Sequence, residues 1–217
     1  QCRRLTWNPN YKGLDDWQLA LRKNAGKAPK TMTFRDRYLY GACAFSEIDA
    51  CVEQWHKTPP DGVPLQAYLG LPDEEYHAFL QPGGNAQLEE LLNAQRKQSG
   101  CRIYQLEFTD TEKTKPFAFS GIDALRKAGF QQPPASEYRL VRDETLYCPK
   151  DEPDLAVLER VFDRYNGKLP ADYPGRCVAP SDVLELYDAE KRRYYYRDMK
   201  QFVPVAFSPL LARPIQK

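Results

Sequence analysis

The chain has 217 residues, of which 42% are hydrophobic and 28% are charged, so it can bury a core, and wholesale disorder is excluded. No apolar run approaches the roughly 18–20 residues that a membrane-spanning helix needs, which excludes a transmembrane protein. The formal net charge of +1 excludes a uniformly basic nucleic-acid-binding protein but leaves room for a local basic patch.

Charge is distributed unevenly along the chain. Residues 1–37 carry nine basic and three acidic side chains, whereas residues 38–98 carry three basic and nine acidic ones. Such asymmetry between segments is more informative than the total charge. We therefore expect a basic N-terminal segment, an acidic helical region and a C-terminal domain that spans residues 99–217.

The first two parts show helical periodicity. The spacing of apolar residues predicts a helix over residues 14–25 in the basic segment. The acidic region predicts several short helices separated by Pro and Gly residues. Ser46 is expected to cap the first of these helices, with Asp49 completing an imperfect capping box. Ile48, Val52 and Trp55 then fall on its inward face.

The C-terminal part of the sequence combines helical periodicity with the two-residue periodicity of strands. Helices are predicted over residues 120–128 and 151–165, the second with an apolar face formed by Leu155, Leu158, Phe162 and Tyr165. Alternating apolar and polar residues predict strands over 101–108, 138–147, 183–187, 193–197 and 201–207. The expected fold class is α+β, with a helical N-terminal half followed by a small antiparallel sheet and two packed helices.

Candidate catalytic groups are sparse. The two histidines, His56 and His77, lie on predicted helices, where a structural role is expected. Ser181 and Asp182 have neither a nucleophile-elbow motif nor a histidine nearby in sequence, so they are interpreted as a turn and the start of a strand. An enzyme with a Cys or His nucleophile remains an alternative, but a non-catalytic protein is expected.

The remaining titratable pairs have structural interpretations. Glu74-Glu75 and Glu89-Glu90 are neighbours on predicted helices and do not face each other, so each pair is expected on a solvated face. No two cysteines have C-x-x-C spacing, and disulfides are not expected. We expect small buried hydrophobic roles for the cysteines, which are Cys2, Cys43, Cys51, Cys101, Cys148 and Cys177. No metal and no cofactor are predicted.

The most distinctive local sequence is K-R-R-Y-Y-Y-R at residues 191–197. In a strand, Tyr194 and Tyr196 would share one face, and Tyr195 would lie on the other with Arg193 and Arg197. Arginines mixed with tyrosines can bind a partner or stack on bases, and they can also pack a hairpin. The candidate partner-binding residues here are Arg192, Arg193, Tyr194, Tyr195, Tyr196 and Arg197.

The basic N-terminal segment supplies further candidate partner-binding residues, Trp7, Arg22 and Lys23. Three interpretations stay open. The segment could contact nucleic-acid phosphates, dock on an acidic protein, or fold back on the chain's own acidic region.

Several motifs in the second half of the chain resemble the YodL-like domain of conjugative elements and phages of Gram-positive bacteria. The similarity covers residues 101–205 and lies in R-I-Y-Q-L-E-F (102–108), L-E-R-V-F-D-R-Y-N (158–166), P-x-D-Y-P-G (170–175), S-D-V-L-E-L-Y (181–187) and Y-Y-Y-R-D (194–198). One departure is the stretch Arg176–Pro180, where the family usually has a polar, Ser-rich segment. Residues 47–56 and 65–76 also resemble a recurring helical motif of the same elements.

The resemblance implies a cytoplasmic protein of a bacterial mobile element with no established enzymatic activity. The leading hypothesis is a non-catalytic macromolecular interaction protein whose partner is a host or element-encoded protein complex. A sharper version is an inhibitor of a host defence complex, such as an anti-CRISPR protein. The alternative is a nucleic-acid-binding accessory protein of conjugation or replication, which strong salt dependence of binding would reveal.

Overall fold

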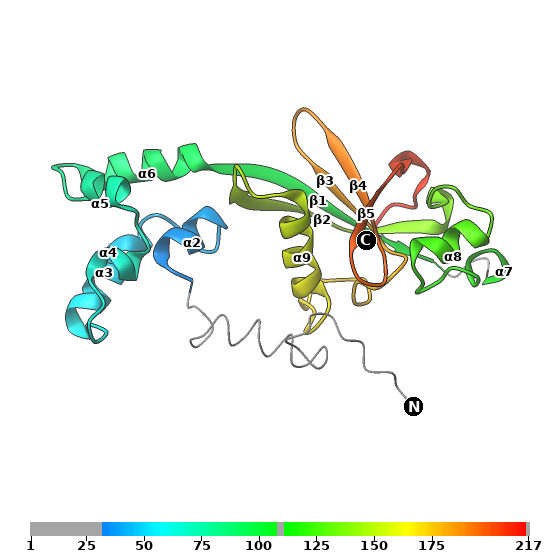
Figure 1. Cartoon of the computed structure of the whole chain (residues 1–217), viewed down its shortest axis with the longest axis horizontal. Helices are drawn as coiled ribbons and strands as arrows, with labels where there is room; N and C mark the ends of the chain where they lie inside the picture. The colour runs from blue at the N-terminus through cyan, green and yellow to red at the C-terminus, as the bar shows by residue number, and fades with distance from the viewer. Residues whose placement is uncertain (1–31, 108–110, 216–217) are drawn as a thin grey trace, which may run out of the picture. The chain divides into compact units, whose positions relative to one another are not determined.

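The computed structural model describes residues 32–107 and 111–215 and divides the chain into two compact units, Gln1–Leu92 and Asn93–Lys217. The predicted helix over residues 14–25 and the candidate contacts Trp7, Arg22 and Lys23 lie outside the described residues. The boundary expected after residue 37 falls inside a helix, α2 (Phe34–Leu39). The expected α+β fold class is confirmed, with helices first and an antiparallel sheet after them (Figure 1).

Short helices build the first unit. They are α2, α3 (Glu47–Lys57), α4 (Leu65–Leu69), α5 (Asp73–Phe79) and α6 (Gly84–Gln95). Helix α2 begins with a capping box, because the Asp36 N–H donates to Thr33 Oγ1 while the Thr33 N–H donates to Asp36 Oδ2. Ile48, Leu69, Leu88 and Leu92 are fully buried at the centre of this unit, as expected for Ile48.

Two predictions for this unit were wrong. Ser46 has helical backbone angles rather than the extended angles typical of an N-cap, and its side chain makes no capping hydrogen bond. Glu75 is buried rather than solvated, whereas Glu74 is exposed as expected. The Arg35 guanidinium, which donates to both Glu75 carboxylate oxygens at 2.7 and 2.9 Å, compensates the buried charge and ties α5 to α2.

The second unit is built on a five-stranded antiparallel sheet in the order β2-β1-β3-β4-β5 (Figure 1). The strands are β1 (Arg96–Leu106), β2 (Tyr138–Pro149), β3 (Val183–Tyr187), β4 (Arg192–Arg197) and β5 (Phe202–Val205). The last three form the predicted meander. Strand β1 begins at Arg96 rather than at the predicted Cys101, because residues 96–99 pair with β2 alone and carry no apolar alternation.

Helix α9 (Asp154–Tyr165) covers one face of this sheet. Its buried side chains are Val157, Leu158, Val161 and Tyr165. The predicted inward position of Leu155 was wrong, since this side chain is 53% exposed. The stripe that faces the sheet is centred on residues 157, 158, 161 and 165, which leaves the first turn of the helix at its margin.

The opposite face of the sheet carries a second core. Tyr104, Val183 and Tyr196 from the strands pack there with Phe117, Leu125 and Phe207. The surrounding elements are α7 (Thr111–Thr114), α8 (Ile122–Lys127), η1 (Ala135–Glu137) and η2 (Pro209–Leu211). The unit therefore has three layers, with α9 on one side of the sheet and α8 with the C-terminal segment on the other.

The described cysteines are all unbridged. Cys101 and Cys148 are buried, as expected for small hydrophobic residues, and burial raises the pKa of both thiols. Cys177 is exposed, contrary to that expectation, because it lies in an open loop. Within the described part of the chain, no helix combines the length and hydrophobicity that crossing a bilayer requires.

Candidate functional site

Strand β4 contains the arginine–tyrosine sequence, and its side chains alternate between the two faces as expected. The Tyr196 hydroxyl donates to the Ser120 carbonyl oxygen at 3.0 Å on one face of the sheet. The Tyr195 hydroxyl donates to Asp154 Oδ2 of α9 at 2.6 Å on the other. Both side chains are buried and hold the sheet to its neighbouring layers.

The three arginines of β4 also meet groups of this unit. Arg192 pairs with Glu185 at 2.8 Å, and Arg193 pairs with Asp154 at 2.5 Å and with Asp188. The Arg197 side chain is buried between aromatic rings. Of the six candidate residues in 192–197, Arg192 presents the most surface, with 51% of its side chain exposed. Partner binding through this strand stays a prediction.

Two tyrosines that join α9 to the sheet give the fold a pH dependence. Burial, together with a hydrogen bond to Asp154, raises the pKa of Tyr195 to about 12. Burial and a hydrogen bond to Glu144 raise the pKa of Tyr165 to about 12. Each raised pKa means that the folded state holds its proton more tightly than the unfolded state does.

We therefore expect the urea midpoint of unfolding to fall once the pH rises above about 9, where the unfolded thiols begin to lose protons, and to keep falling as the pH rises through about 12. Tyr195→Phe removes one of the buried groups that titrate in this range, so its midpoint should fall less steeply over the same range. Urea unfolding at several alkaline pH values tests this. Identical slopes for the wild type and the variant would contradict the assignment to Tyr195.

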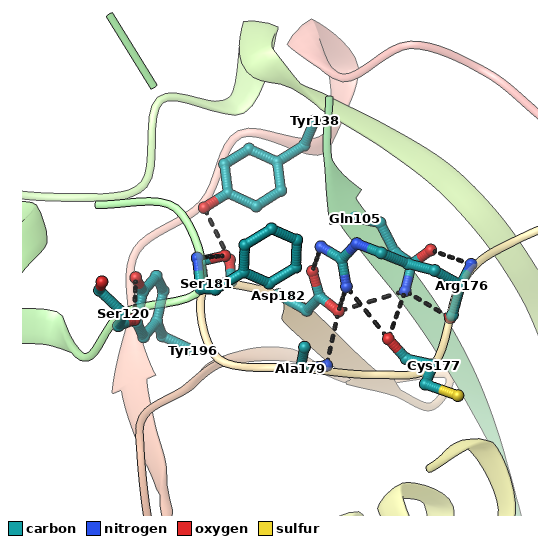
Figure 2. Close-up of polar contacts among 10 residues, drawn as sticks. Gln105, Ser120, Tyr138, Arg176, Cys177, Ala179, Ser181, Asp182 and Tyr196 are labelled. Carbon is teal, nitrogen blue, oxygen red and sulfur yellow. Dashed lines mark hydrogen bonds and ion pairs between the residues drawn. The ribbon is translucent and has the colours of Figure 1, made fainter. Parts of the chain in front are cut away.

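A buried polar cluster lies where the loop before β3 meets the sheet, and its centre is Asp182 (Figure 2). The Arg176 guanidinium donates to both carboxylate oxygens of Asp182, at 2.7 and 2.5 Å. The Ala179 N–H and the Gln105 amide donate to Oδ2 at 3.0 and 3.2 Å. Burial raises the pKa of Asp182, while these donors stabilise its charged form.

Gln105 of β1 holds the backbone of Arg176 in place through two hydrogen bonds. Its side-chain amide accepts from the Arg176 N–H and donates to the Arg176 carbonyl oxygen, both at 2.9 Å. A Cβ on Gly175, the last residue of the P-x-D-Y-P-G turn, would lie 2.6 Å from Gln105 Oε1, so a larger residue there would displace the Gln105 amide that holds Arg176. The turn motif and the Ser-Asp motif are therefore two halves of one structure.

Ser181 precedes Asp182, has a strained backbone conformation, and forms hydrogen bonds with residues on the opposite face of the sheet. Its φ is +80°, and its N–H donates to the Arg197 carbonyl oxygen at 3.0 Å. The Tyr138 hydroxyl donates to the Ser181 carbonyl oxygen, and the Phe119 N–H donates to Ser181 Oγ at 3.2 Å. Phe119 itself has a φ of +54°, and these two are the positive-φ residues other than glycine in the described part of the chain.

The strained pair presents an aromatic ring to solvent. Phe119 is 48% exposed, and the Arg176 guanidinium carbon lies 4.8 Å from the centre of its ring. We call these two side chains the Arg176–Phe119 stack. Since Asp182 holds the guanidinium from beneath, the stack is fixed before any partner arrives, which suits a recognition surface.

The same geometry offers little for catalysis at this cluster. The Asp182 carboxylate is completely buried, and its oxygens already accept from Arg176, Gln105 and Ala179. The Ser181 hydroxyl is also completely buried. A substrate would reach neither group, so the arrangement acts as a structural anchor for the stack above it.

The other sequence candidates lie elsewhere. His56 and His77 are exposed on α3 and α5, and the His56 ring lies edge-on to Trp55. Over the described ranges, no three His, Cys, Asp or Glu side chains are placed to hold a metal ion. Gln105, Phe119 and Arg176 were not among the residues predicted from the sequence. Arg176 lies in the stretch that departs from the family's Ser-rich pattern, and that departure is the signal that could have drawn attention to it.

A family model, the YodL-like domain, matches residues 100–207. The C-terminal half of the chain is a YodL-like domain. The match includes every residue of the Asp182 cluster and the whole of the arginine–tyrosine strand. It supports an association with a mobile genetic element or phage. Neither the curated proteins nor the solved structures contain a significant match to this chain.

Proposed function

We propose that this chain is a non-catalytic interaction protein of a bacterial mobile genetic element, and that the Arg176–Phe119 stack of its YodL-like domain contacts a protein partner. The class of partner to test first is a host defence complex such as a CRISPR effector, which would make the chain an inhibitor of that complex. We propose that this contact takes place in the cytoplasm, where such a complex acts.

The strain at Phe119 carries this proposal. A non-glycine residue in the left-handed region costs about 1 kcal/mol or more. Burial does not repay that cost here, because almost half of the Phe119 side chain is exposed. Strain that persists in an exposed aromatic residue is typical of binding surfaces, and arginine and aromatic side chains are enriched among the residues that dominate binding energy.

Ion pairs between the arginines and carboxylates of the same chain favour a protein partner over nucleic acid. Arg192 and Arg193 meet Glu185, Asp154 and Asp188, and Arg176 meets Asp182. Phosphates would have to compete with these carboxylates, since each guanidinium is already neutralised. Contacts through Trp7, Arg22 and Lys23 remain a separate prediction.

Phe119→Asn should separate binding from stability. Asparagine tolerates a positive φ, so the relief of strain offsets the lost stacking of about 0.5–1 kcal/mol, and the free energy of unfolding should change by less than about 1 kcal/mol. Recovery of the partner from a nuclease-treated Gram-positive lysate should fall about tenfold. Quantitative mass spectrometry of tagged wild-type and variant protein measures that recovery.

The matched control is Leu155→Gln, which removes a similarly exposed apolar side chain from α9. Its recovery should equal that of the wild type. Recovery that is equal for wild type and Phe119→Asn would contradict the proposed surface. Recovery that collapses with nuclease or high salt in the wild type would favour direct nucleic-acid binding instead.

A further inference from the structure

Arg197, at the end of β4, has an unusual environment for a charged side chain. Only 8% of the residue is exposed. Its guanidinium carbon lies 4.1 Å from the centre of the Phe162 ring of α9 and 5.0 Å from that of the Phe202 ring of β5. Two rings on the guanidinium fix the orientation of its plane.

The N–H groups of the Arg197 guanidinium have no acceptor within the described residues. Nε and Nη1 are both enclosed and make no hydrogen bond. Nη2 makes none either, and it is the one nitrogen of the three that is not enclosed. Ten other arginines of this unit form ion pairs; they are Arg102, Arg126, Arg139, Arg142, Arg160, Arg164, Arg176, Arg192, Arg193 and Arg213.

The neighbouring carboxylates influence Arg197 without contacting it. Glu159 and Asp198 raise its pKa through their charges, whereas burial, the larger influence, lowers it. Asp198 Oδ1 is already engaged by the Ile122 N–H at 2.9 Å. Glu159 is exposed on α9, so it is the internal competitor for Arg197 that an experiment must address.

We propose that the Arg197 guanidinium binds a single carboxylate group, supplied by an acidic side chain of a partner protein. The Nη2 donor has no acceptor among the described residues, and an incoming carboxylate supplies one. A carboxylate oxygen can accept from Nη2, the nitrogen that is not enclosed, and the group brings one negative charge. A phosphate brings more charge toward Glu159 and Asp198, so it fits less well. The carboxylate site at Arg197 is independent of the proposed function; only its occupation by a side chain of a partner protein rests on that function.

The test is a titration of the full-length, ¹⁵N-labelled chain with sodium acetate, followed by NMR. The Nε–Hε resonance of Arg197, assigned by triple-resonance spectra of the wild type, should shift and saturate with acetate. Sodium chloride at matched ionic strength should leave it in place, and phosphate should shift it less at equal concentration. No shift, or a response to chloride equal to that to acetate, would overturn the proposal.

Two variants complete the experiment. Glu159→Gln removes a charge that acts on Arg197 and should still bind acetate as the wild type does; if only this variant binds acetate, Glu159 is the true partner and the proposal fails. Phe119→Asn should leave acetate binding unchanged. Saturable acetate binding without capture of any protein partner would support the Arg197 site and contradict the proposed function, so the two ideas can fail separately.

Discussion

Replacing Asp182 by alanine should lower the free energy of unfolding of the C-terminal unit by about 2–4 kcal/mol, as expected when a buried carboxylate that serves several donors is removed. The loss leaves the Arg176 guanidinium and the Gln105 amide without their shared acceptor. It also frees the Ala179 N–H that holds the loop before β3. Urea-induced unfolding followed by circular dichroism measures this change.

A double-mutant cycle with Arg176→Met provides the control. The double variant should be more stable than Asp182→Ala alone, because it no longer contains a half-buried guanidinium without its carboxylate. A loss below about 1 kcal/mol for Asp182→Ala, or additive losses in the double variant, would show that the Asp182 cluster does not act as a unit.

Replacing Glu185 by alanine should cost about 2–4 kcal/mol, because this completely buried carboxylate serves several donors. The Tyr104 hydroxyl donates to Glu185 Oε2 at 2.8 Å, and Arg192 donates to Oε1 at 2.8 Å. The variant would leave the buried Tyr104 hydroxyl without an acceptor and Arg192 without its carboxylate. Urea-induced unfolding of the purified chain is again the measurement.

Glu185→Gln is the matched control, since it keeps the shape and one acceptor oxygen. It should lose markedly less stability than Glu185→Ala. If alanine and glutamine cost the same, the charge of Glu185 rather than its hydrogen bonds dominates, and the role assigned to the Tyr104 contact is wrong.

Local sequence patterns predicted the parts of the fold that local physics determines. The alternation in residues 183–207 gave the three-strand meander, and the 3.6-residue spacing before Asn166 gave α9. The polar start of β1 could not be predicted, because Arg96 to Ser99 become a strand only by pairing with β2. The burial of Glu75 likewise depends on Arg35, which lies 40 residues away.

The candidate site depended even more on distant contacts. The Ser-Asp and P-x-D-Y-P-G motifs were visible in the sequence. No local sequence pattern, however, indicates that Arg176 stacks on Phe119 and donates hydrogen bonds to Asp182. Phenylalanine does not signal a positive φ, as glycine or asparagine would. The Phe119 N–H donates to Ser181 Oγ, 62 residues later, so only the three-dimensional structure reveals the stack.

The central claim is that a strained, pre-fixed Arg176–Phe119 stack binds a protein partner. The most direct test is the dissociation constant of the purified partner for wild-type and Phe119→Asn protein, measured beside the free energy of unfolding of each. We predict a dissociation constant about tenfold higher for the variant, at a free energy of unfolding within about 1 kcal/mol of the wild type. Equal affinity, or a loss of affinity that is matched by unfolding of the variant, would contradict it.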